Sequence, residues 1–231
     1  MRATLRARPM MLAAGAIVVG AMAALGAGQV AGAAQVPECL GKPATIVGTS
    51  GDDVLRGTRR QDVIVSLGGD DQIQLVGNSG FRFDLVCAGT GNDVLRGGTG
   101  RSRLFGDQGA DTILGGPSID RIHGGEGQGD ILRGGPGVDE VYPGADGARV
   151  AHGGRGHDTL VGYEPDDTLR GGRGDDTLIG QEGDDRLLGN RGQDDLRGAQ
   201  GFDTGNGGSN PDLGPDVCRS VERPTNCETL E

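Results

Sequence analysis

A nine-residue period runs through most of this chain and restricts what it can fold into. Aligned on its glycines, residues 48–206 divide into seventeen consecutive units, with four extra residues at 75–78 and one extra residue in each of the units 124–133 and 143–152. Position six is Asp in fifteen units, and position eight is Leu, Ile or Val in fifteen. Two columns that keep their phase over this length indicate a solenoid of short repeated elements rather than a disordered acidic segment.

Each column has a physical role. The glycines in the first half of a unit permit the positive φ angles and close backbone approach that tight turns need. The last three residues of a unit, such as Thr177-Leu178-Ile179, alternate around one apolar side chain and predict a very short strand with one inward residue. A single unit cannot bury its Leu alone, whereas stacked coils form a continuous apolar ladder. The sequence therefore predicts an all-β protein made of turns and strands.

Two units carry a family resemblance. GGRGHDTLV at 153–161 and GGRGDDTLI at 171–179 match the nonapeptide G-G-x-G-x-D-x-U-x at every specified position. Over residues 48–206 the chain resembles secreted RTX-type, or hemolysin-type, calcium-binding repeat proteins. The resemblance implies a right-handed parallel β-roll solenoid with two nonapeptides per coil, here about eight coils. It also implies calcium ions between turns stacked on the same edge, held by position-six carboxylates and turn carbonyls.

The resemblance makes the position-six carboxylates the candidate metal ligands. These are Asp53, Asp62, Asp71, Asp84, Asp93, Asp111, Asp120, Asp130, Asp139, Asp158, Asp167, Asp176, Asp185, Asp194 and Asp203. Ions between units n and n+2 would pair Asp158 with Asp176, Asp167 with Asp185, Asp176 with Asp194, and Asp185 with Asp203. Because oxygen-only, flexible coordination suits calcium better than magnesium, we expect several Ca²⁺ ions as the cofactor.

Several units depart from the pattern, and we expect weaker binding there. Ser102 stands where Asp belongs, and unit 143–152 offers only Ala148 or the out-of-register Asp146. Arg59-Arg60 and Ser66-Leu67 replace glycines in the opening units. We also expect the insertion at 75–78 and the unit 143–152 to bulge or interrupt the coils.

Other recurrent polar residues have simpler interpretations. The acid at position five, as in Asp175, and His157 are expected to be exposed turn residues. Arginines recur at or near position nine, where outward charge limits edge aggregation and offsets the acid. They are Arg56, Arg96, Arg133, Arg170 and Arg197.

The first 33 residues differ from the rest. A start containing Arg2, Arg6 and Arg8 precedes an apolar, Ala-rich stretch, and Ala31-Gly32-Ala33 offers small residues for cleavage. This pattern predicts a secretory signal peptide over 1–33; the alternative is a retained anchor helix, because the apolar stretch is just long enough to span a bilayer. After cleavage we expect no membrane insertion, and a secreted, extracellular protein.

The four cysteines, Cys39, Cys87, Cys218 and Cys227, are even in number in a chain predicted to be exported, so disulfides are expected. Cys218 and Cys227 would close a short C-terminal loop, and Cys39 with Cys87 would bracket the other end; free thiols are the alternative. None of the pairs has the C-x-x-C spacing of a zinc site. The expected domains are an N-terminal cap at 34–47, the repeat array at 48–206, and a disulfide-bearing C-terminal cap at 207–231.

Net charge and motif content limit the function classes. A formal charge of −11, from 33 acidic against 22 basic residues, argues against nucleic acid and anionic membrane surfaces as partners. The carboxylates belong to a repeating column rather than to a unique cleft, and no G-x-S-x-G motif occurs, so we expect no enzyme activity. We predict a calcium-binding structural or cell-surface interaction module. The alternatives are a polysaccharide-modifying or other secreted enzyme that uses the roll surface, and a simple ion buffer.

Overall fold

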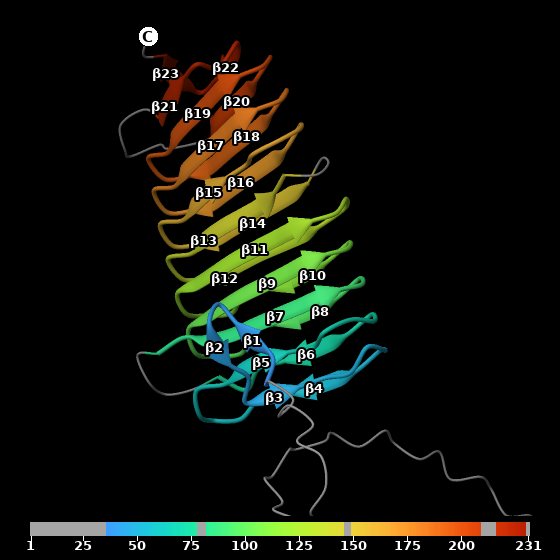
Figure 1. Cartoon of the computed structure of the whole chain (residues 1–231). Coiled ribbons are helices and arrows are strands. Elements are labelled where there is room, and N and C mark those ends of the chain that lie inside the picture. The colour runs from blue at the N-terminus through green and yellow to red at the C-terminus, as the bar shows by residue number, and fades with distance from the viewer. Residues whose placement is uncertain (1–35, 78–81, 146–148, 209–215, 230–231) are drawn as a thin grey trace, which may run out of the picture.

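The computed structural model describes residues 36–77, 82–145, 149–208 and 216–229. These residues form 23 strands and no helix, and therefore no helix that could cross a membrane. From β3 (Ile46–Val47) onward the strands alternate along the chain between two parallel sheets, so that each pair of successive strands makes one coil (Figure 1). About nine coils result, which confirms the predicted all-β parallel solenoid.

The first parallel sheet has ten strands. In spatial order they are β4 (Val54–Arg56), β6 (Gln72–Gln74), β8 (Val94–Arg96), β10 (Thr112–Leu114), β12 (Ile131–Pro136), β14 (Val150–Arg155), β16 (Thr168–Arg173), β18 (Arg186–Arg191), β20 (Thr204–Gly208) and β22 (Arg223–Thr225). The three residues after each position-six place begin a strand, and the order of the strands follows the sequence because each coil stacks on the previous one.

The second parallel sheet has eleven strands. They are β3 (Ile46–Val47), β5 (Val63–Val65), β7 (Asp84–Thr90), β9 (Ser102–Gln108), β11 (Asp120–Glu126), β13 (Glu140–Gly144), β15 (Thr159–Val161), β17 (Thr177–Glu182), β19 (Asp195–Gln200), β21 (Asp216–Arg219) and β23 (Cys227–Thr229). Strands β21 and β23, which follow the array, continue this sheet, since β21 pairs with β19 and β23 with β21, both in parallel, while β22 continues the ten-stranded sheet beside β20.

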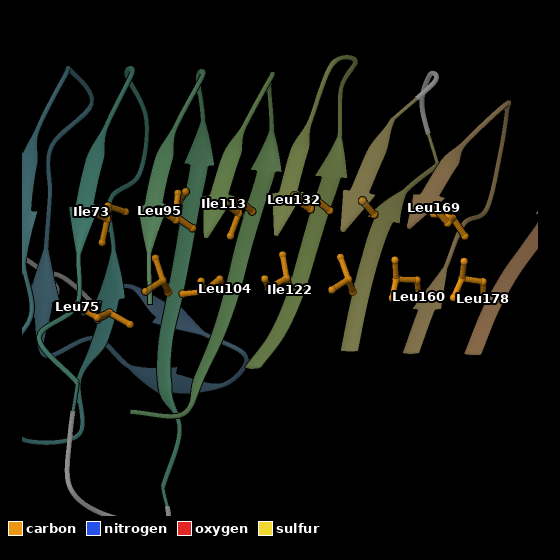
Figure 2. Close-up of a cluster of buried hydrophobic side chains, with 14 of the residues drawn as sticks. Ile73, Leu75, Leu95, Leu104, Ile113, Ile122, Leu132, Leu160, Leu169 and Leu178 are labelled. Atoms are coloured by element: carbon orange, nitrogen blue, oxygen red, sulfur yellow. The ribbon is translucent and has the colours of Figure 1, made fainter. Parts of the chain in front are cut away.

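The position-eight side chains fill the space between the two sheets. Leu95, Ile113, Leu132 and Leu169 from one sheet face Leu104, Ile122, Leu160 and Leu178 from the other, and all are fully buried (Figure 2). The core is thus one residue deep on each strand, as the sequence pattern predicts. Two departures from consensus also enter this ladder: Ala151 in the irregular unit, and Cys218 beyond the array.

The irregular units lengthen their coils, as expected of a bulge, but they do not interrupt the sheets, so the expected interruption was wrong. Strand β7 pairs with β5 across a spacing of 22 residues, with Val63 opposite Leu85, and β14 pairs with β12 across 19, with Ile131 opposite Val150. The extra residues lie in the turns, part of which falls outside the described residues. Leu75, at the start of the insertion, is buried in the core and prolongs the ladder.

Disulfides hold the described segments on either side of the repeat array to the sheets. The bond between Cys39 and Cys87 holds the hairpin of β1 (Glu38–Cys39) and β2 (Lys42–Pro43) to the second sheet, where Cys39 packs against Val63 and Leu85. The bond between Cys218 and Cys227 joins β21 to β23. Both predicted bonds are present, and no free cysteine occurs among the described residues.

Candidate metal centre

The position-six aspartates form two columns, each running along one edge of the roll. In one column each aspartate lies at the start of a strand of the ten-stranded sheet: Asp53, Asp71, Asp93, Asp111, Asp130, Asp167, Asp185 and Asp203. In the other column each aspartate lies at the start of a strand of the eleven-stranded sheet: Asp62, Asp84, Asp120, Asp139, Asp158, Asp176 and Asp194. All except the half-buried Asp53 are buried. Lining up the turns of alternate units therefore stacks carboxylates coil upon coil.

One oxygen of each carboxylate ties neighbouring coils together. The backbone N–H of Asp158 donates to Asp176 Oδ1 at 2.8 Å, and that of Asp176 donates to Asp194 Oδ1 at 2.9 Å. The same bond joins Asp167 to Asp185 and Asp185 to Asp203. The structure thus makes neighbours of all four carboxylate pairs that the repeat predicts, and each Oδ1 lowers the cost of burying its carboxylate by accepting an amide hydrogen bond.

The second oxygen is left without a donor in most of the units. Buried Oδ2 atoms with no hydrogen-bond partner among the described residues belong to Asp71, Asp93, Asp111, Asp120, Asp139, Asp158, Asp176, Asp185, Asp194 and Asp203. Burial raises the pKa of Asp176 to about 8 and that of Asp185 to about 7, and the neighbouring acids in each column add to the rise. A buried carboxylate oxygen of this kind needs a proton or a cation.

The missing side chain of the position-one glycine leaves space beside these oxygens. A methyl group at Gly115 would lie 2.7 Å from Asp120 Oδ2 and 2.6 Å from the carbonyl oxygen of Gly134 in the next coil. At Gly134 the corresponding distances, to Asp139 Oδ2 and the carbonyl oxygen of Gly153, are 2.5 and 2.7 Å. Hard oxygens of two coils therefore converge where only glycine fits, and this donor set suits Ca²⁺.

The donors in this set are carboxylates and carbonyls rather than clustered side chains. Among the described residues, no three His, Cys, Asp or Glu side chains come together as a potential metal site. In the first two units of the array, backbone amides supply donors to Oδ2. The N–H of Thr49 donates to Asp53 Oδ2, and the N–H of Thr58 donates to Asp62 Oδ2, both at 2.6 Å. These two carboxylates are therefore satisfied within the chain.

Arg149 occupies a position-six place, which the sequence alignment failed to identify. Its backbone N–H donates to Asp167 Oδ1, as an aspartate's would. Its buried guanidinium donates from Nε to Asp130 Oδ2 at 3.0 Å, and from Nη2 to the carbonyls of Gly125, at 3.1 Å, and Gly127. The positively charged guanidinium of Arg149 therefore contacts one Oδ2 and the carbonyls of positions two and four of the same turn. Ala148 and Asp146, the residues expected here, fall outside the described part.

Ser102 fills the other exceptional position-six place without a carboxylate. Both its backbone N–H and its Oγ donate to Asp120 Oδ1 at 2.7 Å. The serine therefore keeps the link between the coils but supplies no anionic oxygen. Weak metal binding at this turn stays a prediction.

Two further acids prolong the columns beyond the array. Asp216 Oδ1 accepts from the N–H of Asp194 at 2.8 Å, and Glu222 Oε2 accepts from the N–H of Asp203 at 2.6 Å. Asp216 could have been found from the sequence, because Asp216-Val217-Cys218 repeats positions six to eight with Cys as the apolar residue. Glu222 carries no such signal, since its longer side chain reaches the amide from outside the repeat.

The position-five residues are exposed, as expected, but they also hold the turns together. Asp175 Oδ1 accepts from the N–H of Gln193 at 2.8 Å, and Asp184 Oδ1 accepts from the N–H of Phe202 at 2.9 Å. His157 Nδ1 accepts from the N–H of Asp175 at 2.9 Å. The outer acid therefore caps an amide in the next coil and leaves the inner acid as the only buried carboxylate of the pair.

Without calcium, we expect the fold to be more stable in mild acid than in base. The raised pKa values mean that the folded chain holds protons which the unfolded chain, with Asp near 3.8, has lost. That stabilisation is complete below the unfolded pKa and is lost as the pH rises towards about 8. Circular dichroism in calcium-free buffer should show more β-structure at about pH 5.5 than at about pH 8; the opposite order would contradict this account.

Comparison with known proteins identifies the repeats. A family model described as the RTX calcium-binding nonapeptide repeat matches residues 47–80, 88–122, 115–147, 152–187, 162–196 and 170–205, which together exceed half of the chain. No curated protein matches the sequence significantly.

Proposed function

Since this chain belongs to the RTX calcium-binding nonapeptide repeat family, we propose that it is a secreted structural module whose folding is coupled to calcium and which acts by binding partners at the cell surface or in the matrix. The family assignment itself establishes a calcium-binding repeat protein. The proposal adds the coupling to folding, the secreted location and the interaction role.

The observation that carries the proposal is the row of buried Oδ2 atoms without donors. Asp158, Asp176 and Asp194 on one edge, with Asp185 and Asp203 on the other, are the carboxylates we assign to the ions, and turn carbonyls complete the donor set. Bound calcium would supply the positive charge that these oxygens lack. The guanidinium of Arg149, which takes that role at one turn, supports the assignment.

Export is supported by the two disulfides and by the sequence at 1–33, which falls outside the described residues. Structural disulfides persist in oxidising compartments, and a calcium-dependent fold suits passage from a low-calcium to a high-calcium compartment. The basic start and the apolar stretch are those of a signal peptide. An extracellular protein with ends fixed by disulfides is the consistent interpretation.

A catalytic role has less support. Three hollows on the described surface are lined by Arg, Gly, Leu, Lys, Gln, Phe, Pro, Thr and Asn residues, and no Asp, Glu, His, Ser or Cys lines any of the three. The acids instead repeat at equal spacing along two edges, where none is distinguished as an acid or a base. We therefore expect no glycan cleavage or epimerisation by the purified protein.

Asp176→Asn tests the calcium assignment. Asparagine keeps the volume and the Oδ1 acceptor for the N–H of Asp158, but it removes the charge shared by two stacked sites. We expect equilibrium dialysis to show fewer bound ions per chain and a calcium midpoint raised roughly tenfold. The matched control is Asp175→Asn, which keeps the exposed cap on Gln193 and should leave both quantities nearly unchanged. Equal effects of the two variants would refute the assignment.

A further inference from the structure

The ten-stranded sheet carries arginines and no acidic residue on its described strands. Its arginines are Arg56, Arg96, Arg133, Arg155, Arg170, Arg173, Arg186, Arg191 and Arg223. All nine are exposed. The net charge of −11 predicts that the protein as a whole repels polyanions. The two sheets can nevertheless differ in charge, because alternate units of the repeat lie on different sheets.

None of these nine arginines has an ion pair with a described residue, whereas those of the other sheet have partners. On the eleven-stranded sheet, Arg121 pairs with Glu140, Arg197 and Arg219 both pair with Asp195, and Arg103 lies over the ring of Phe83. The nine arginines of the ten-stranded sheet therefore do not serve to pair with acidic side chains of the described residues. Its charges are available to a partner.

Three of the arginines lie side by side in like-charged register. Arg155 is paired with Arg173, and Arg173 with Arg191, on consecutive strands β14, β16 and β18. Like charges directly opposite one another destabilise a sheet, and no described acid offsets them. The same three side chains, with Gly154 and Gly172 between them, line a hollow of about 520 Å³. An anionic ligand along this row would relieve the repulsion.

We propose that the outer face of the ten-stranded sheet binds a linear acidic polysaccharide whose chain crosses the strands. Guanidinium groups repeated from strand to strand, about 4.8 Å apart, match a polymer with regularly spaced carboxylates, which Arg binds in bidentate fashion. Gln72, Gln74, Thr168 and Asn206 on the same strands supply donors and acceptors for sugar hydroxyls. Arg186 and Arg223 line a second hollow of about 280 Å³, so the cationic path extends to β22.

Nucleic acid fits this face less well. Single strands are held by bases stacked on aromatic side chains. The described strands of this sheet contain no Phe, Tyr or Trp, and their one aromatic side chain, His152, is half-buried. The aromatic stack of the protein, Phe105, His123 and Tyr142, lies on the other sheet. The proposal names a partner class for the interaction module proposed above, and it requires the calcium-loaded fold.

The test measures binding of the calcium-loaded protein to immobilised hyaluronan, a linear uronate polymer, with neutral dextran as the blank. Replacing Arg155, Arg173 and Arg191 together by Gln should weaken binding at least roughly tenfold. The Lys triple keeps the charge but loses the bidentate fork, and should fall in between. Because the Gln triple removes repulsion, its thermal unfolding temperature should be no lower than that of the wild type.

The matched control replaces Arg121, Arg197 and Arg219 of the other sheet by Gln, which changes the net charge equally. We expect binding within about twofold of the wild type for this control. Circular dichroism in calcium, measured on each variant, separates loss of binding from loss of the fold. The proposal is overturned if folded wild-type protein does not bind hyaluronan, if the two triples lose equal affinity, or if duplex or single-stranded DNA binds more tightly than hyaluronan.

Discussion

Removing calcium is expected to unfold most of the roll at neutral pH. Ten buried aspartates of the described residues have an Oδ2 without a donor, and an uncompensated buried charge costs several kcal/mol. Domain stability is only about 5–15 kcal/mol, and the core here is one residue deep per strand. Protonation neutralises only part of each column at pH 7, because Asp176, with a pKa of about 8, holds its proton there whereas Asp93, with a pKa of about 6, does not. Without cations, the carboxylates that stay ionised repel one another along each column.

Far-UV circular dichroism of the mature protein, with disulfides intact, measures this effect. The spectrum in EGTA should be that of a largely unfolded chain, and millimolar calcium should restore β-structure cooperatively, because ions that bind only the folded state add their binding free energy to its stability. Magnesium at the same concentration should restore much less, since it demands a small octahedral site. A spectrum rich in β-structure in EGTA, and unchanged by calcium, would refute the coupling.

The repeating part of this structure was predictable because two chemical requirements recur with the same period. The side chains of Leu178 and its equivalents must point into the core, and Asp176 and its equivalents must follow a glycine turn. Their positions within the nine-residue period therefore suffice to identify them. The sequence analysis also predicted the disulfide between Cys218 and Cys227, and it offered Cys39 with Cys87 as the other pair. The four stacked carboxylate pairs followed from the family resemblance, which implies a coil of two units and so brings residues eighteen apart together.

What the sequence analysis missed lies where the period shifts or where the coil brings distant residues together. One extra residue in unit 143–152 moved the alignment to Ala148, whereas strand pairing across 19 residues puts Arg149 in the column. Leu75 was assigned to an insertion, although the core accepts it. The segregation of arginines follows from an eighteen-residue coil, in which Arg155, Arg173 and Arg191 become neighbours; a nine-residue alignment mixes the two faces.

Replacing Arg149 by Met is expected to be among the most destabilising changes of a charged residue. Methionine preserves much of the volume, but it leaves Asp130 Oδ2 and the carbonyls of Gly125 and Gly127 without the donors that Arg149 supplies. Removing one partner of a buried ion pair typically costs about 3–5 kcal/mol. Burial raises the pKa of Asp130, and the nearby guanidinium opposes that rise, so the pKa of this carboxyl should rise further in the variant.

Urea unfolding in saturating calcium measures the loss of free energy of unfolding. The control is Arg155→Met, because Arg155 is exposed and has no ion pair with a described residue; this variant should change the free energy of unfolding by less than about 0.5 kcal/mol. Arg149→Asp is the decisive companion because it restores the repeat consensus. If the guanidinium takes the place of an ion, this variant should be unstable at low calcium, recover as calcium rises, and bind at least one more ion per chain than the wild type. An Arg149→Met protein as stable as the wild type, or an Arg149→Asp protein indifferent to calcium, would show that Arg149 is not a substitute for a cation.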